Sequence, residues 1–170
     1  MVVKELLYQV RGEIASLEQV YETLLVKVEG LAEKAERDEL SGLLRRKAFF
    51  DRWHQLLDQC TLAGIEAGVI LVDVDHFKKI NDTRGHAAGD EVIRRMGKLL
   101  RQFEGTGVIV GRYGGEEFAV AYSGGLERGL RLSEQIHEES RRTVEVTVSQ
   151  GLHAAARGES PSLDQADEAL

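Results

Sequence analysis

Residues 111–122 read Gly-Arg-Tyr-Gly-Gly-Glu-Glu-Phe-Ala-Val-Ala-Tyr, and the Gly114-Gly115 pair separates two runs rich in apolar, β-branched or aromatic residues. Both central positions of a type I′ turn need positive φ, so a Gly-Gly pair in this setting predicts a two-residue hairpin turn. Glu116 and Glu117 follow directly and would place two carboxylates at the hairpin tip. Strand alternation sends the two side chains to opposite faces, although near a turn both can still reach one ion.

Glycines at the tip also remove side-chain bulk, which lets a phosphate approach the backbone closely. Two carboxylates beside such a backbone suggest a metal ion with a phosphorylated ligand. A tight turn followed by two solvated acids explains the Gly114 to Phe118 pentapeptide equally well. The rest of the chain has to decide between these two interpretations.

A second pair of acids ends the apolar run of residues 69–75, Val-Ile-Leu-Val-Asp-Val-Asp. A continuous apolar run of this length predicts a central strand that is buried on both faces and has a functional carboxyl end. Alternation places Asp73 and Asp75 on the same face. A carboxylate at the end of a buried strand is desolvated and is rarely tolerated unless a metal ion or hydrogen bonds compensate it. The pair therefore favours chemistry over plain surface charge.

Three amphipathic patterns predict helices around this strand. The first runs from about Arg45 to Thr61, and the second opens at Gly89 with Asp90 as its N-cap. The third follows Gly125. Its packed face is expected to hold Leu126, Leu130, Ser133 and Ile136.

Two further strand patterns complete the order of elements. The hairpin occupies residues 108–122, and Val144, Val146 and Val148 alternate with polar residues as in a half-buried strand. The resulting order is strand, helix, hairpin, helix, strand. That order is the βαββαβ pattern of a ferredoxin-like or palm-type sheet.

The N-terminal residues 1–37 follow a different rule, because their apolar residues recur at alternating spacings of four and three, the heptad signal of a coiled coil. The heptad residues are Val3, Leu7, Val10, Ile14, Leu17, Tyr21, Leu24, Val28, Leu31 and Ala35. Branched residues at a with leucine at d favour a parallel homodimer, while further apolar residues beside the stripe leave a tetramer or a packed helical bundle open. Asp38 takes the next d position and ends the seam, so we expect a second domain over 38–170.

The composition excludes several classes of protein. The net charge of 22 − 29 = −7 argues against a nucleic-acid-binding surface, so an anionic substrate would need metal ions or locally placed cations. The single cysteine, Cys60, lies at helical spacing from Trp53 and Leu57 and is interpreted as a core thiol in a reducing compartment. No run approaches the roughly 18 apolar residues of a membrane span, and charges interrupt the N-terminus. We expect a soluble, cytoplasmic protein without a membrane segment in this chain.

Four segments occur in order: Asp38-x-Leu40-Ser41-Gly42-Leu43, residues 73–82, Gly85-His86-x-x-Gly89-Asp90, and residues 112–118. Together they resemble the GGDEF family of diguanylate cyclases, which condense two GTP into cyclic di-GMP. The resemblance covers about residues 38–170. It implies an α/β fold of the α+β kind, a palm or nucleotidyl-cyclase-like βαββαβ sheet domain preceded by the coiled-coil helix.

The resemblance implies a metal site in which Asp73, the backbone carbonyl of Val74 and the hairpin acids Glu116 and Glu117 bind two Mg²⁺ or Mn²⁺ ions per active site. Glu116 is expected to accept the proton of the attacking 3′-hydroxyl. The division of metal binding and base duty between Glu116 and Glu117 stays open. Two metal ions can lower the pKa of that hydroxyl and neutralise the triphosphate while pyrophosphate leaves.

The resemblance also implies a set of residues that contact GTP: Lys78, Asn81, His86, Asp90, Phe77, Leu40 and Gly115. Lys78 and the hairpin backbone would hold phosphates, and Lys78 is expected to be catalytic with Glu116. Asn81 and Asp90 match the guanine-reading positions, with His86 nearby. A carboxylate at Asp90 can accept from the N1-H and N2-H edge of guanine, which favours GTP over ATP and is compatible with an N-cap role.

Three departures from the family pattern carry information. Gly105 and Val108 stand where the product-inhibition motif Arg-x-x-Asp is expected, so feedback through that site is expected to be absent. Arg45 and Gln150 replace a usual Asn and Ile and are interpreted as structural variations. After residues 166–170 the family continues into a segment whose Lys and Arg hold phosphates, so the chain is either trimmed there or lacks those cations.

The leading functional hypothesis is a diguanylate cyclase in which the stalk holds two protomers face to face, so that each 3′-hydroxyl attacks the opposite α-phosphate. An upstream sensor domain or signal would act through the packing of the stalk. Two alternatives stay open. One is a catalytically silent GTP or cyclic di-GMP sensor of the same fold, and the other is a scaffold whose acids are surface charge.

Overall fold

The structure is a computed structural model that describes residues 2–155, 159 and 161–170. The chain divides into two compact units, Met1–Glu36 and Arg37–Leu170. Within the described residues no helix has the length and apolar character needed to cross a membrane.

The first unit is a single helix, α1 (Val2–Glu36). Its heptad side chains are strongly exposed in the single chain, with exposed fractions of 50% for Ile14 and 68% for Leu17. The side chain of Leu7 lies outside the described residues. A continuous apolar stripe this exposed is typical of a helix that pairs with another helix.

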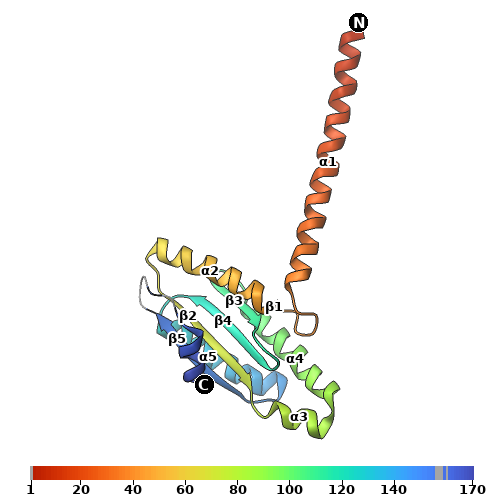
Figure 1. Cartoon of the computed structure of the whole chain (residues 1–170). Helices are drawn as coiled ribbons and strands as arrows, with labels where there is room; N and C mark the ends of the chain where they lie inside the picture. The colour runs from red at the N-terminus through yellow and green to blue at the C-terminus, as the bar shows by residue number, and fades with distance from the viewer. Residues whose placement is uncertain (1, 156–158, 160) are drawn as a thin grey trace. The chain divides into compact units, whose positions relative to one another are not determined.

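The second unit is built on a five-stranded mixed sheet with the strand order β1-β3-β4-β2-β5 (Figure 1). The strands are β1 (Leu44–Arg45), β2 (Ala67–Val74), β3 (Val108–Arg112), β4 (Glu117–Ser123) and β5 (Val148–Ala155). The central strand β2 pairs antiparallel with both β4 and β5, β3 and β4 form the hairpin, and β1 adds parallel to β3. The predicted order of strand, helix, hairpin, helix and strand is confirmed.

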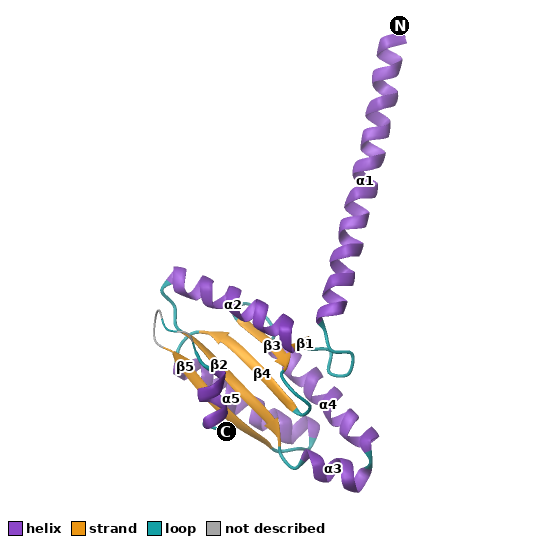
Figure 2. Cartoon of the chain, viewed as in Figure 1, coloured by secondary structure: helices purple, strands orange, loops and turns teal. Residues whose placement is uncertain are grey.

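Helices cover both faces of this sheet (Figure 2). They are α2 (Arg46–Ala63), α3 (Phe77–Arg84), α4 (His86–Leu100), α5 (Leu126–Glu139) and α6 (Leu163–Glu168), with a 3-10 turn at Arg101–Phe103 and a π-helical turn at Ser140–Val144. Side chains of α4 and α5 share one apolar cluster with the sheet, while those of α2 and α6 share the other.

The two clusters explain why the apolar run in β2 is continuous. Ile70 and Val72 are fully buried on the side of α4 and α5, whereas Val69 and Leu71 pack on the opposite side with α2. Burying a side chain of this size stabilises the fold by about 1.5 to 3 kcal/mol. Cys60 is a buried free thiol in the α2 cluster, as predicted.

Two expectations about the ends of elements are wrong. Helix α4 begins at His86 and follows Gly85, whose φ is 82°, so Asp90 lies inside the helix and is not its N-cap. Val144 belongs to the π-helical turn, and strand β5 begins only at Val148. In both places the helical backbone is longer than the polarity pattern predicts. Helix α4 starts before Asp90, and the helical turn after α5 extends through Val144.

The packed face of α5 also differs from the expectation. Leu126 and Leu130 are each 55% exposed, whereas Gly129 and Ile136 are buried. A Cβ added at Gly129 would lie 2.0 Å from the hydroxyl oxygen of Tyr122, so this face needs a glycine for close approach to the sheet. A glycine carries no apolar signal, so periodicity placed Leu126 and Leu130 on the packed face and missed Gly129, whereas Ile136 is buried as predicted.

Candidate active site

The hairpin turn spans residues 113–116 and is longer than the predicted two-residue turn. The N–H groups of Tyr113 and Gly114 both donate to the carbonyl of Glu117, at 2.8 and 3.1 Å. Neither Gly114 nor Gly115 has a positive φ, so the predicted type I′ turn is wrong. Gly114 instead makes room for a carboxylate, because a Cβ there would lie 2.0 Å from Oε2 of Glu117. Gly115 is exposed, and a Cβ there would meet nothing within 4 Å.

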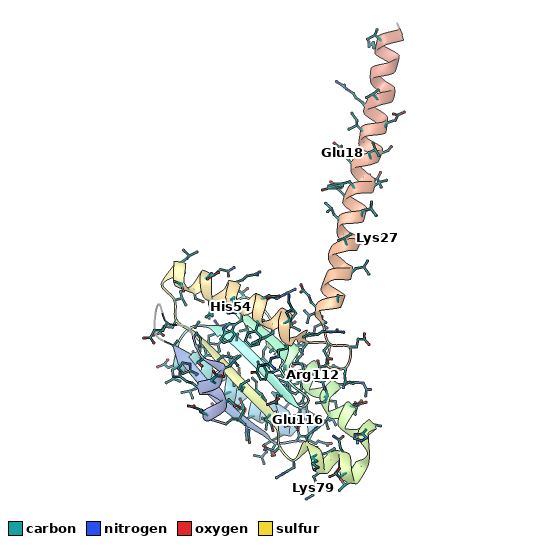
Figure 3. The ribbon with its side chains drawn as sticks, in the orientation of Figure 1. Glu18, Lys27, His54, Lys79, Arg112 and Glu116 are labelled. Carbon is teal, nitrogen blue, oxygen red and sulfur yellow. The ribbon has the colours of Figure 1, made fainter. Side chains whose placement is uncertain are left out.

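Strand pairing brings the hairpin acids to the carboxyl end of β2. Asp73 lies opposite Glu117 in the register, and the N–H of Val74 donates to the carbonyl of Glu116 at 3.4 Å. Figure 3 labels Glu116 at this end of the sheet. Burial, followed by the charges of Glu116, Glu117 and Asp75, raises the pKa of Asp73. The carboxylates are thus close enough to repel one another, which a cation between them would relieve.

Asp75, unlike Asp73, has neighbours that offset the cost of burying its charge. Burial raises the pKa of Asp75, but hydrogen bonds from Ser149 and Thr147 together with the charge of His76 outweigh it, so the pKa lies below its usual value. The Ser149 hydroxyl donates to Oδ1 of Asp75 at 2.6 Å. Among the described residues no lysine or arginine forms an ion pair with Asp73. The uncompensated acid is therefore Asp73.

The donor chemistry of the site fits a hard divalent cation, since Mg²⁺ and Mn²⁺ prefer carboxylate and carbonyl oxygen. The residues that could supply it are Asp73, Val74, Glu116 and Glu117. Within the described part of the chain, the side chains do not form a cluster of three or more His, Cys, Asp or Glu residues with the geometry of a metal site. The fit rests on the donor types and on the uncompensated charge at Asp73.

Helices α3 and α4 bring together part of the predicted nucleotide site. A Cβ added at Gly89 would lie 2.0 Å from Oδ1 of Asn81 and 3.1 Å from Cζ of Phe77. Asn81 and Phe77 of α3 therefore contact the residue that precedes Asp90 on α4. Close approach of the two helices explains the glycine at position 89.

The structure describes the other residues that are predicted to bind the substrate, but it does not connect them to the contact of Asn81 and Phe77 with Gly89. The side chains of Lys78, His86 and Asp90 are exposed, and Leu40 packs at the edge of the α4 and α5 cluster. No hydrogen bond or ion pair among the described residues ties Lys78, His86 or Asp90 to the hairpin acids. Their roles stay predictions.

Arg112 has a structural role that sequence reasoning missed. Its Nη2 donates to the carbonyl of Gly115 at 2.7 Å, and its Nε donates to the carbonyl of Gly114 at 3.2 Å. Its Nη1 donates to Oδ1 of Asp38 at 2.8 Å. One guanidinium thus holds the carbonyls of the turn and ties them to the segment after α1. An arginine two residues before a Gly-Gly pair is the signal that could have revealed it.

Asp38 is well compensated in this arrangement. It accepts hydrogen bonds from the N–H and the hydroxyl of Ser41, at 2.9 and 2.8 Å. Burial raises the pKa of Asp38, but the hydrogen bonds from Ser41 and Arg112 outweigh it, so the pKa lies below its usual value.

Arg45 and Gln150, which depart from the family pattern, both make hydrogen bonds within the fold. Nε of Arg45 donates to the carbonyl of Arg37, and Nε2 of Gln150 donates to the carbonyl of Ser133.

The Asp38→Asn variant should lose about 1 to 2 kcal/mol of unfolding free energy at neutral pH, because it removes the charge that pairs with Arg112. Since the folded pKa of Asp38 is lowered, the stabilisation is present above the unfolded value of 3.8 and is lost as pH falls through the folded pKa. Urea unfolding at neutral and acid pH measures this. The control is Glu39→Gln, whose carboxylate is 95% exposed and 3.9 Å from Arg45. Equal losses in both variants, or a deficit that persists in acid, would contradict the assignment.

The mixed sheet, with an uncompensated acid at the end of its central strand and a Gly-Gly hairpin beside it, defines a palm-type α+β domain. The sequence profile described as "Diguanylate cyclase, GGDEF domain" matches residues 35–170. The chain belongs to the GGDEF family, which confirms the resemblance and the fold class.

Individual relatives agree with this assignment. Diguanylate cyclase VdcA of Vibrio cholerae is 41% identical over 108 residues, which cover 64% of this chain and 30% of the relative. Response regulator PleD of Caulobacter vibrioides is 36% identical over 152 residues, 81% of this chain and 34% of the relative. The chain spans about a third of the length of these curated relatives.

Solved structures are similar over both units. The coiled coil and GGDEF domain of DgcB from Caulobacter crescentus, solved in complex with c-di-GMP, is 26% identical, with a TM-score of 0.74. The similarity covers 94% of this chain and 87% of that chain.

Proposed function

We propose that this chain is an active diguanylate cyclase, which condenses two GTP into cyclic di-GMP and two pyrophosphates. The observation that carries the proposal is the uncompensated carboxylate of Asp73, which lies in register with Glu117 and beside the open backbone of Gly115. A silent binding module would not need an acid in so unfavourable a place. Family membership supplies the reaction class.

The residues divide into a reacting set and a binding set. Asp73, the Val74 carbonyl, Glu116 and Glu117 would hold two Mg²⁺ or Mn²⁺ ions, which would lower the pKa of the 3′-hydroxyl and neutralise the triphosphate. Glu116 accepts the hydroxyl proton as the 3′-oxygen attacks the α-phosphate. Lys78 and the N–H of Gly115 hold the phosphates of the leaving group.

The base is recognised between α3 and α4. Asn81 and Asp90 bind the edge of guanine, with His86 near the nucleotide and with Phe77 and Leu40 at the apolar margin of the site. A carboxylate accepts from both N–H groups of the guanine edge, whereas adenine offers no matching pair of donors. The site therefore selects GTP over ATP.

The reaction needs two protomers, because each supplies one GTP. The exposed heptad residues of α1 are the dimerisation surface, and pairing through α1 raises the local concentration of one catalytic unit near the other. A signal from an upstream domain or ligand that changes the packing of α1 then controls activity.

The direct test is incubation with GTP and Mg²⁺, followed by chromatography for cyclic di-GMP, with ATP as the substrate control. Product from GTP and none from ATP supports the proposal. GTP binding without product at high protein concentration would identify a silent sensor. A chain that binds no nucleotide would be a scaffold.

Gly89→Ala tests the base site. The added Cβ would lie 2.0 Å from Oδ1 of Asn81 and would displace that side chain. We expect KM for GTP to rise about 10-fold, with kcat nearly unchanged, because one or two hydrogen bonds to the base are lost. Steady-state kinetics measures both constants.

The matched control is Gly105→Ala, where an added Cβ meets nothing within 4 Å. That variant should have the kinetic constants of the wild type. An unchanged KM in Gly89→Ala would show that Asn81 does not contact the nucleotide.

A further inference from the structure

A cavity of about 350 Å³ lies beside α3, and Asn81 does not line it. It is formed by α3, α4 and the segment that leads into β5. Its apolar lining consists of Ile80, Ala88, Val92, Val144 and Val146. The volume lies within the range of small-molecule sites, and these apolar side chains offer a surface on which a planar ring can pack. None of the residues assigned to GTP or metal binding lines it.

The charges at the rim of this cavity favour an anion. Lys79 and Arg84 line it, and no ion pair or side-chain hydrogen bond of either residue occurs within the described part of the chain. Figure 3 labels Lys79 on the exposed side of α3. The rim is thus locally cationic although the chain carries a net charge of −7.

The acids of the rim are already paired. Glu145 pairs with Arg95 at 3.7 Å, and Glu91 pairs with Arg94 at 3.1 Å. Arg95 also donates to the carbonyl of Thr143. These pairs leave Lys79 and Arg84 as the cations available to a ligand.

Backbone conformation singles out the same cavity. In residues 2–155, 159 and 161–170, only His76 and Glu145 combine a side chain with positive φ, at 58° and 65°. Both line the cavity, from two different segments. This conformation costs about 1 to 2 kcal/mol for a residue with a Cβ, and such residues concentrate at ligand sites.

We propose that this cavity binds a phosphorylated ligand with a planar ring, of which a nucleoside monophosphate is the smallest example. Lys79 and Arg84 bind the phosphate, and the ring packs on Ile80, Val92 and Val144. The bound ligand bridges α3 to the segment before β5. Helix α3 has no buried residue of its own, so this bridge would fix its position.

The test is methyl NMR on the whole chain, with GMP as the probe and without divalent ions. GMP should shift the methyl signals of Ile80, Val92, Val144 and Val146 in a saturable way. The Lys79→Ala/Arg84→Ala double variant should bind GMP about 10-fold or more weakly, since two charge-assisted contacts are lost. Lys98→Ala, which removes an exposed cation of α4 outside the cavity, should bind like the wild type.

Four results would overturn the proposal. The first is the absence of any shift up to about 10 mM GMP, the weakest affinity of interest for such a site. The second is a set of shifts confined to methyl groups outside the cavity, such as those of Leu40. The others are unchanged affinity in the double variant and inorganic phosphate binding as tightly as GMP. The last result would show that no ring is recognised. Circular dichroism of each variant confirms that it is folded.

Discussion

Replacing Asp73 with asparagine is expected to abolish dinucleotide synthesis and, at the same time, to stabilise the metal-free protein. Asparagine keeps the shape of the side chain but removes the charge that burial, Glu116, Glu117 and Asp75 disfavour. Loss of an essential metal ligand should reduce the rate about 1000-fold or more. The midpoint of thermal unfolding in a chelator should rise by a few degrees, since about 1 kcal/mol shifts it by roughly 2 to 4 °C at this size.

The size of this stability gain depends on pH. Because the folded pKa of Asp73 is raised above 3.8, the folded state binds more protons than the unfolded state, and stability falls as pH rises through the folded pKa. The gain from Asp73→Asn should therefore be small in acid and should grow toward neutral pH.

The control for this prediction is Asp75→Asn. The hydrogen bonds of Ser149 and Thr147 compensate Asp75, so its replacement should lower the unfolding midpoint. A lower midpoint in Asp73→Asn, or an active Asp73→Asn enzyme, would contradict the assignment of Asp73 as the uncompensated metal ligand.

Removal of α1 is expected to make activity depend on protein concentration. A linked partner has an effective concentration near millimolar, so residues 37–170 alone should lose about 100-fold in activity per protomer at submicromolar concentration and recover it as concentration rises. Product formation across a dilution series measures this, with sedimentation to follow the oligomer.

Point variants in α1 separate pairing from other effects of truncation. Leu24 is 54% exposed at a d position, and glutamate there should weaken pairing and reproduce the truncated behaviour. Gln19 lies at the outer f position, so Gln19→Glu should be neutral. Equal activity per protomer with and without α1 at low concentration would exclude control by the stalk.

Periodicity predicted the order of the helices and strands along the chain well because its main signal is burial. The run of residues 69–75 had to be a central strand, and the heptads of the first residues had to form a long helix. The same signal failed at two glycines. Gly129 packs closely on Tyr122, and Gly85, whose φ is 82°, precedes a helix that starts before Asp90. A residue without a side chain can be the closest contact of a helix and still leave no apolar pattern.

The acidic residues of the candidate site could be predicted from the sequence, but their arrangement in space could not. Asp73, Glu116 and Glu117 were found from their neighbours in the sequence, and the strand register brings them together. The contact between Arg112 and Asp38 joins residues 74 positions apart, so no local rule predicts it. The cavity behind α3 depends on Val144 and Glu145, whose helical turn and positive φ have no clear signature in the sequence.

The central position of β2 has a consequence for the synthesis of the protein. Both neighbours of β2 are made later, and the last of them ends at Ala155. At about 5 to 20 residues per second, strand β2, which ends at Val74, waits roughly 4 to 16 s on the ribosome for its partners. Helix α1 needs only local contacts and emerges earlier. Neighbouring nascent chains on one message could therefore pair through α1 before either has folded its catalytic unit.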